Sequence, residues 1–144
     1  MHVSAVIKRK GNTIVTITGN QTIAEAANQL TANRIGAVLV VDRKDTIAGI
    51  ISERDIIRGV AEHGAKVLDM AVERLMTREV LTCRPGDTIS DIMGVMTRQR
   101  IRHLPVVDDG KLLGIISIGD VVKQRLDEAD LEVETLRGYV IGNS

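Results

Sequence analysis

A seven-residue stretch occurs twice in the chain, and this duplication restricts the possible folds more than any other feature. Gly-Ile-Ile-Ser-Glu-Arg-Asp runs from Gly49 to Asp55, and Gly-Ile-Ile-Ser-Ile-Gly-Asp runs from Gly114 to Asp120. Upstream identities recur at an offset of 66 residues, which falls to 65 at the motif itself. The upstream residues shared by both copies, named in the first copy, are Thr16, Thr22, Ile23, Thr31, Arg34, Ile35, Val40, Val41 and Asp42. The chain therefore contains a true internal repeat.

A length of 144 residues is typical of one domain. The two repeats must therefore share a core or pack as intimate halves, and we expect neither half to be stable alone. The predicted segments are an N-terminal lead-in at 1–12, the first repeat at 13–64, a structured connector at 65–79, the second repeat at 80–126, and a C-terminal helix or tail at 127–144.

Hydrophobic periodicity and capping residues predict a β-α-β-β-α order in the first repeat. Thr22 with Glu25, and Ser52 with Asp55, have the spacing of capping boxes at the start of helices. The predicted elements are strand 13–18, helix 22–33, buried strand 37–41, turn 42–45, strand 46–51 and helix 53–63. We expect the last of these helices to direct Ile56, Ile57 and Val60 inward.

The second repeat follows the same order. Its predicted elements are strand 80–83, turn 84–87, a helix capped by Thr88 and Asp91, strand 104–107, turn 108–111, strand 112–116 and a helix from Ser117. The apolar face of its first helix contains Ile89, Ile92, Met93 and Met96. The fold class is therefore α/β, of the α+β kind.

Three segments lie outside the repeats. Lys8 to Asn12 is interpreted as a solvated turn. The connector carries apolar residues dense enough to pack on both halves. The C-terminal segment continues the last helix with apolar residues at intervals, interrupted by the acidic stretch 127–130. Such a tail packs either on a partner subunit or back on its own chain, and the sequence leaves both possibilities open.

Composition argues against several classes of function. Nineteen acidic residues balance nineteen basic ones, so the chain lacks the basic excess that drives nucleic-acid binding. The chain has no Phe or Trp, and its one cysteine provides neither an intrachain disulfide nor a thiolate metal cluster. We find neither a signal peptide nor an apolar run long enough to span a membrane, so we expect a cytoplasmic protein that binds no membrane.

A β-α-β-β-α unit used twice resembles the cystathionine β-synthase (CBS) domain. The chain resembles a stand-alone tandem CBS pair, or Bateman module, over about residues 3–138. The resemblance is carried by Gly49-Ile-Ile-Ser-x-x-Asp55, Gly114-Ile-Ile-Ser-x-x-Asp120 and Ile101-Arg102-His103-Leu104-Pro105-Val106-Val107-Asp108. It implies two repeats packed with pseudo-two-fold symmetry and ligand clefts between them.

The Ser-x-x-Asp pairs permit two interpretations. Each pair satisfies the free N–H groups at a helix start whether or not a ligand binds. A helix N-terminus also attracts anions, and a fixed carboxylate beside it can accept hydrogen bonds from both ribose hydroxyls. The family resemblance favours the second interpretation, with Asp55 and Asp120 holding a ribose.

The resemblance also implies which residues form each cleft. The main nucleotide cleft comprises Ser52, Arg54, Asp55, Val80, Leu81, Ile101, Arg102 and His103. The second cleft comprises Ser117, Gly119, Asp120, Thr13, Val15, Ile35, Gly36 and Ala37. Only the main cleft contains a full phosphate-binding set, because Arg102 can bind a phosphate bidentately and His103 can donate a hydrogen bond. We therefore expect the second cleft to be weaker or empty.

The predicted function is a regulatory module, not an enzyme, that binds AMP, ADP or ATP. It would signal to an unidentified effector protein in trans and would form a homodimer. NAD(H) is the alternative ligand, and S-adenosylmethionine fits less well because it offers no phosphate to Arg102. A ligand-free dimerisation scaffold is the alternative from another class. No metal-ligand spacing, P-loop, dinucleotide motif or nucleophile elbow is present, so we expect no catalytic cofactor.

Overall fold

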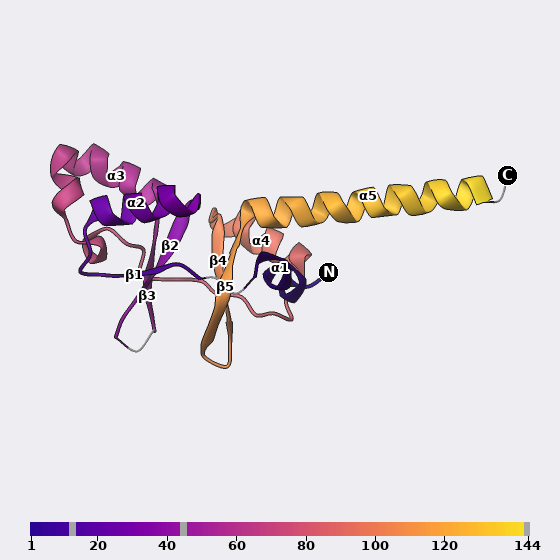
Figure 1. The fold of residues 1–144 in the computed structure, drawn as a ribbon, viewed down its shortest axis with the longest axis horizontal. Helices are drawn as coiled ribbons and strands as arrows, with labels where there is room; N and C mark the ends of the chain where they lie inside the picture. The colour runs from indigo at the N-terminus through magenta and orange to yellow at the C-terminus, as the bar shows by residue number, and fades with distance from the viewer. Residues whose placement is uncertain (12–13, 44–45, 143–144) are drawn as a thin grey trace. The chain divides into compact units, whose positions relative to one another are not determined.

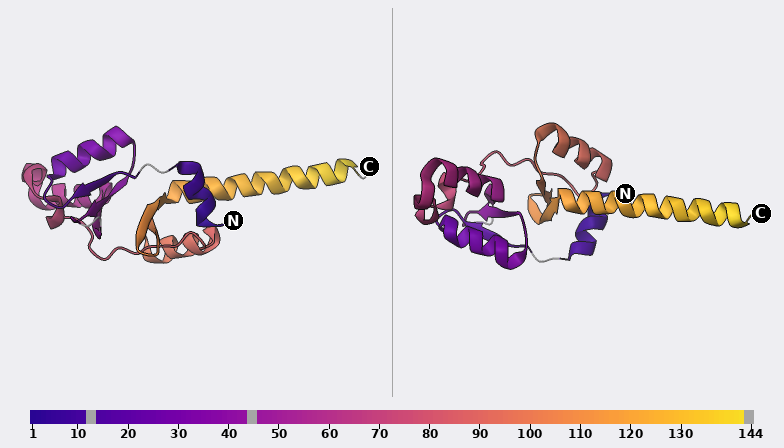
Figure 2. Two further views of the ribbon diagram at one scale, coloured as in Figure 1. Left: turned by 60° about the horizontal axis from the view of Figure 1, so that its bottom comes forward. Right: turned by 90° about the horizontal axis from the view of Figure 1, so that it is seen from above.

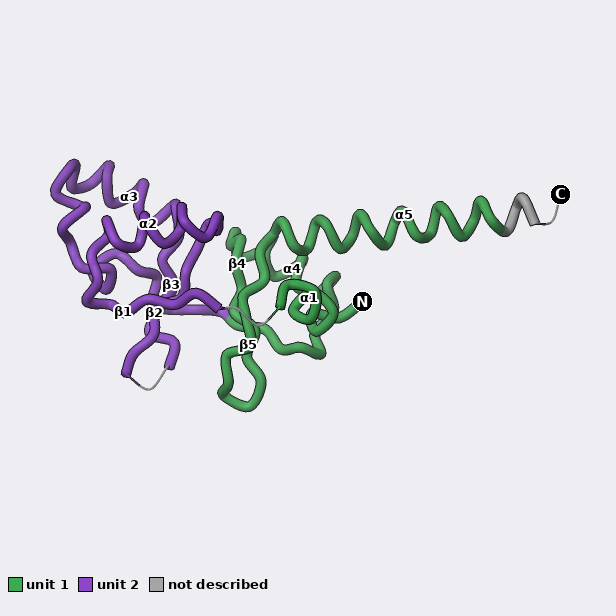
Figure 3. Tube along the Cα trace, in the orientation of Figure 1, with its two compact units in different colours: residues 1–13, 82–144 green, residues 14–81 purple. Residues whose placement is uncertain are grey.

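The chain forms two compact units, each built from helices and strands (Figure 3). The computed structural model describes residues 1–11, 14–43 and 46–142. Unit 1 combines residues 1–13 with residues 82–144, whereas unit 2 is the continuous segment 14–81. The mixed α/β class is as predicted, but the unit boundaries show that the N-terminal segment belongs with the second repeat.

Unit 2 contains a three-stranded sheet covered by helices (Figure 1). Its strand order is β1-β2-β3, with β1 parallel to β2 and β2 antiparallel to β3. The elements are β1 (Thr16–Thr18), α2 (Ile23–Asn33), β2 (Ala37–Val41), β3 (Ile47–Ser52) and α3 (Glu53–His63). All five follow the sequence prediction except that β1 is shorter. The predicted turn positions 44 and 45 lie outside the described residues.

The central strand β2 is buried along its whole length, as its continuous apolar sequence predicts. Ile23, Ala26 and Leu30 of α2 pack on the same core. The connector forms two short 3-10 helices, η1 (Gly64–Asp69) and η2 (Val72–Arg74). Because Val67, Val72 and Met76 are buried in this core, the connector is a structural part of unit 2.

The inward face predicted for α3 is confirmed for Ile56, which packs against the unit 2 core, but is wrong for Ile57 and Val60. The side chains of Ile57 and Val60 are 67% and 50% exposed, whereas Asp55 and Gly59 are buried. Gly59 faces the connector so closely that a Cβ there would lie 2.8 Å from Val67 Cγ2. The buried face of α3 is therefore set by close approach to the connector, which hydrophobic periodicity does not reveal.

Unit 1 repeats the helix and hairpin of unit 2 but, in the part that the structure describes, contains one strand fewer. Its elements are α1 (Val3–Lys10), α4 (Ile89–Gln99), β4 (His103–Asp108), β5 (Lys111–Ser117) and α5 (Ile118–Gly142). The strands β4 and β5 form an antiparallel hairpin. The predicted strand 80–83 does not form, and only Cys83 makes an isolated bridge, to Val106.

The N-terminal segment is an integral part of unit 1, and its interpretation as a lead-in ending in a solvated turn was wrong. Residues Lys8 to Lys10 form the last turn of α1 and Gly11 is its C-cap, whereas Asn12 of the predicted turn lies outside the described residues. Val3 and Val6 are buried among Ile89, Ile92 and Leu104. Arg9 and Lys10 are exposed but make ion pairs, so this helix is held by both apolar and polar contacts.

The N-terminal segment and the connector hold equivalent places in the two units. Met1 O accepts a hydrogen bond from Ile89 N at 3.0 Å, and Met70 O accepts one from Ile23 N at 2.9 Å. Val3 N donates to Asp87 O, and the corresponding Val72 N donates to Gln21 O. The N-terminal segment thus supports the start of α4 in the second repeat, and the connector supports the start of α2 in the first repeat. The two repeats have exchanged their leading segments.

The recurrent glycine of the motif permits this exchange. A Cβ at Gly49 would lie 2.7 Å from Met76 Sδ and 2.8 Å from Thr77 O. A Cβ at Gly114 would lie 2.9 Å from Ile7 Cδ1 of α1. In each unit the glycine gives the exchanged segment room to lie against the hairpin strand.

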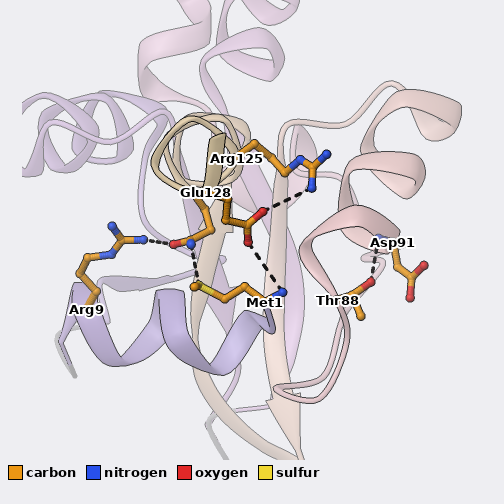
Figure 4. Close-up of polar contacts among 7 residues, drawn as sticks. Met1, Arg9, Thr88, Asp91, Arg125 and Glu128 are labelled. Atoms are coloured by element: carbon orange, nitrogen blue, oxygen red, sulfur yellow. Dashed lines mark hydrogen bonds and ion pairs between the residues drawn. The ribbon is translucent and has the colours of Figure 1, made fainter. Parts of the chain in front are cut away.

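Polar contacts fasten α1 to the base of α5 (Figure 4). Arg9 Nη1 lies 3.0 Å from Asp127 Oδ2, and Arg9 Nη2 donates to Oε1 of the buried Gln124. The Met1 amino group lies 3.7 Å from Glu128 Oε1, and Arg125 contacts the other carboxylate oxygen at 3.3 Å. The first turns of α5 therefore have a fixed direction within unit 1.

Candidate functional site

The first Ser-x-x-Asp pair lies where β3 passes directly into α3. Ser52 caps the helix: its Oγ accepts a hydrogen bond from Asp55 N at 3.3 Å. Asp55 Oδ2 in turn accepts from Ser52 N at 2.9 Å and from Ser52 Oγ at 3.1 Å. The predicted capping box is confirmed, and it fixes a carboxylate at the positive end of the α3 dipole.

Two further residues contact the Asp55 carboxylate, and the sequence analysis missed both. Thr77 Oγ1 donates to Asp55 Oδ1 at 3.3 Å, and Arg58 Nη1 lies 3.5 Å from the same oxygen. Thr77 comes from the connector and is placed there by two backbone hydrogen bonds with Ile50 of β3. The Asp55 side chain is only 5% exposed. A buried carboxylate with four polar partners is rigid, which suits recognition of a fixed pattern of hydroxyl donors.

The second Ser-x-x-Asp pair lies at the start of α5 and has a different partner. Ser117 N donates to Asp120 Oδ2 at 2.8 Å, and Asp120 N donates to Ser117 Oγ at 3.2 Å. Lys10 Nζ, at the end of α1, lies 2.8 Å from Asp120 Oδ2 and also donates to Ile115 O at 2.8 Å. The ammonium group thus binds the carboxylate that was predicted to hold a ribose.

The Lys10 contact changes the electrostatics of Asp120. Burial by itself raises the pKa of this carboxyl, but the hydrogen bonds from Lys10 and Ser117 and the positive charge of Lys10 outweigh burial. The pKa of Asp120 is therefore lowered from 3.8. Asp120 is ionised at neutral pH, and one of its oxygens is already paired with a cation.

Each unit joins the loop before its buried strand to its own Ser-x-x-Asp helix. Ile118 N donates to Arg102 O at 2.8 Å, and His103 is paired with Ser117 in the hairpin. In unit 2 the same positions are held by Gly36, whose O accepts from Glu53 N, and by Ala37, which is paired with Ser52. The Arg102 side chain is exposed, whereas His103 is half-buried. Unit 1 therefore brings Arg102 and His103 beside Ser117.

The remaining predicted residues lie on both units. Unit 2 contains Arg54, exposed on the first turn of α3, and the coil residues Val80 and Leu81. It also contains Val15 and Ile35, which pack against its core. Ile101 packs against the unit 1 core, and Gly119 lies on the first turn of α5. Thr13 lies outside the described residues. That residues of both units combine into two clefts stays a prediction.

Among the described residues, no group of three or more His, Cys, Asp or Glu side chains is placed to hold a metal ion. In the same part of the chain, no helix is both long and apolar enough to cross a membrane.

Comparison with known proteins identifies the family. The CBS domain model matches residues 3–62 and 72–127. These two matches begin at the exchanged segments, so each match covers a sequence repeat and crosses both structural units. A mitochondrial CBS domain-containing protein of Arabidopsis thaliana is 34% identical over 97% of this chain and 72% of its own length. The match to a relative from Acidianus ambivalens covers 65% of that relative's length.

Solved structures show the same fold. A CBS-domain containing protein from Agrobacterium tumefaciens is 44% identical with a TM-score of 0.85, covering 87% of this chain and 99% of that one. A CBS domain protein from Pyrobaculum aerophilum, solved with AMP, is 29% identical with a TM-score of 0.74, covering 83% and 89%. A CBS domain pair solved with 5′-methylthioadenosine and S-adenosylmethionine is 26% identical with a TM-score of 0.79, covering 89% and 98%. The chain belongs to the CBS domain family and consists of two CBS domains in tandem.

Proposed function

We propose that this chain is a regulatory module that binds an adenine nucleotide, AMP, ADP or ATP, chiefly at Asp55. The observation that carries the proposal is the buried Asp55 carboxylate, held by Ser52 and Thr77 at the N-terminus of α3. A helix cap needs one oxygen of this carboxylate, and Ser52 already satisfies that requirement through Oδ2. The second oxygen, Oδ1, contacts Thr77 and Arg58 at 3.3 and 3.5 Å, contacts long enough to be exchanged for ribose hydroxyls.

The adenosine ligands of related proteins support a ligand of this class. Relatives with the same fold were solved with AMP, or with 5′-methylthioadenosine and S-adenosylmethionine. These molecules share an adenosine, whose ribose presents two neighbouring hydroxyl donors. A fixed carboxylate is the natural acceptor for such a pair.

We assign phosphate recognition to Arg102 and His103, which would complete the main cleft with Ser52, Arg54, Asp55, Val80, Leu81 and Ile101. An exposed guanidinium can bind a phosphate through two parallel hydrogen bonds, and the α3 N-terminus favours the same negative charge. This assignment favours AMP, ADP or ATP over S-adenosylmethionine, which has no phosphate. NAD(H) remains the alternative ligand because it shares the adenosine, and its two phosphates and second ribose would extend from the same site.

The second cleft, around Asp120, is proposed to be the weaker one. Lys10 Nζ lies 2.8 Å from Asp120 Oδ2, the oxygen that also accepts from Ser117 N, so an ammonium group competes with a ribose for this carboxylate. The cation beside Asp55, Arg58, lies farther from its carboxylate, at 3.5 Å. This difference supports the predicted order of the two sites.

Regulation would operate by a shift of populations. A ligand that contacts both CBS domains favours the arrangement that it bridges, and an effector protein in trans would respond to that arrangement. A homodimer and a cytoplasmic location remain predictions of the sequence. Ser52 and Asp55 already satisfy one another as a helix cap without a ligand. This observation is what supports the alternative of a ligand-free scaffold.

Thermal unfolding with separate additions of AMP, ADP, ATP, NAD and S-adenosylmethionine tests the proposal. At about 1 mM, a ligand with a dissociation constant of about 10 μM stabilises the fold by about 2.7 kcal/mol, a rise in Tm of several degrees. The rise should disappear in Asp55→Asn, which keeps the shape of the cap, and shrink in Arg102→Glu. Arg98→Glu, at an exposed position of α4, serves as the charge-matched control. If nucleotide-free protein shows no rise with any ligand, the scaffold alternative is supported instead.

A further inference from the structure

The last helix carries an exposed apolar stripe that is longer than the exposed apolar pair, Ile57 and Val60, on α3. Beyond its first turns, α5 extends away from the rest of unit 1 (Figures 1 and 2). Leu126 and Leu136 are 59% and 64% exposed on this extension. The stripe consists of Val122, Leu126, Ala129, Val133 and Leu136, all exposed. The spacings alternate between four and three residues, which is the heptad repeat of a coiled-coil seam.

In this heptad, Leu126 and Val133 occupy the a positions, and Val122, Ala129 and Leu136 occupy the d positions. The residues by which α5 contacts its own unit include the buried Val121 and Gln124, the half-buried Glu128, and Asp120 and Asp127, which pair with Lys10 and Arg9. They fall at the b, c and f positions, away from the a and d positions of the stripe. A second helix can therefore cover the stripe without displacing any contact that fixes α5 within unit 1.

The charges beside the stripe indicate what covers it. Arg125 and Glu132 occupy g positions, and Asp130 and Arg137 occupy e positions. In a parallel pair, each g residue faces the e residue five positions later on the other helix. Arg125 would then face Asp130 of the partner subunit, and Glu132 would face Arg137 of the partner subunit. Both pairs are attractive, and symmetry makes each occur twice.

We propose that α5 forms a parallel two-stranded coiled coil with α5 of a second copy of this chain. Val133 at an a position next to Leu136 at a d position is the pattern that favours two strands. An antiparallel pair that aligns the stripe with itself, with Leu126 against Leu136 of the partner subunit, would place Asp130 against Asp130 of the partner subunit and Glu132 against Glu132 of the partner subunit. Over the length of the stripe, the charges therefore favour the parallel order. The interface does not involve Asp55 or Asp120. The coiled-coil proposal is therefore independent of the proposal that the chain binds a nucleotide.

Charge exchange tests the pairing. Glu132→Arg and Arg137→Glu each turn two attractions into repulsions, and each should raise the dimer dissociation constant about tenfold. A mixture of the two variants restores both attractions, so it should form a heterodimer about as tight as the original. Glu134→Arg, at the outward b position, is the matched control. Sedimentation of the full chain measures all four, and failure of the mixture to recover would overturn the pairing.

Cysteine cross-linking tests the direction of the helices. In Leu136→Cys, the new thiols face one another across the two-fold axis of a parallel pair and should form a disulfide-linked dimer. Glu134→Cys should not. The native Cys83 gives little background because it is buried, with a pKa raised to about 12 by burial and by Asp87. A monomeric wild type, or equal cross-linking of the two variants, would refute the parallel coiled coil.

Discussion

Truncation of Val3 to alanine is expected to destabilise a part of the fold that lies about 90 residues further along the chain. Val3 is completely buried, and its neighbours in the core include Ile89 and Leu104. The substitution removes two buried methyl-sized groups, at about 0.8 kcal/mol each, and leaves a cavity that adds about 1 kcal/mol. The expected loss is therefore about 2–3 kcal/mol, or a fall in Tm of about 5–10 °C.

The location of the loss is more informative than its size. Amide hydrogen exchange should show faster opening of α4, β4 and β5 in Val3→Ala. Val72→Ala removes the equivalent buried side chain from unit 2, and its effect should centre on α2, β2 and β3. Ser4→Ala changes an exposed side chain on the same helix as Val3 and should leave the exchange rates nearly unchanged. If Val3→Ala instead loosened β1 to β3, the exchange of leading segments would be incorrect.

Three further predictions follow from the glycine of the motif and from Lys10. Gly49→Ala should cost about 1–3 kcal/mol, because the new Cβ meets the backbone oxygen of Thr77 at 2.8 Å. Gly114→Ala meets only the end of the Ile7 side chain and should cost less, so equal losses in urea unfolding would contradict this explanation. Lys10→Met removes the ammonium group from Asp120. Calorimetric titration with adenosine should then show two binding sites where the wild type shows one. An unchanged stoichiometry would mean that Lys10 does not compete with adenosine for Asp120. Because the pKa of Asp120 is lowered from 3.8 in the folded protein, its contribution is present above about pH 4 and is lost as the pH falls through the lowered value. The unfolding midpoint should therefore fall more steeply in acid for the wild type than for Lys10→Met, and parallel curves would show that the pair contributes nothing.

Most helices and strands could be predicted because their signals are local. The capping boxes at Thr22 and Ser52 and the continuous apolar run of β2 predicted three elements of unit 2 within a residue of their observed starts. The failures occurred where distant segments meet. The apolar side chains at 57 and 60 suggested a buried face, yet α3 buries Gly59 because the connector passes directly beneath it. Residues 80–83 have strand propensity, but Cys83 alone pairs with a neighbouring strand.

In the candidate site, too, local contacts could be predicted from the sequence and contacts between distant segments could not. Ser52 with Asp55, and Ser117 with Asp120, are partners three residues apart, so their spacing was enough to predict their hydrogen bonds. The groups that distinguish the two carboxylates, Thr77 and Lys10, lie outside the repeated motif and arrive with the exchanged segments. An alignment of the two copies over residues 16–55 and 82–120 contains neither residue. The repeat therefore predicts that two similar sites exist, and only the packing of the exchanged segments reveals that one carboxylate meets a hydroxyl and the other an ammonium group.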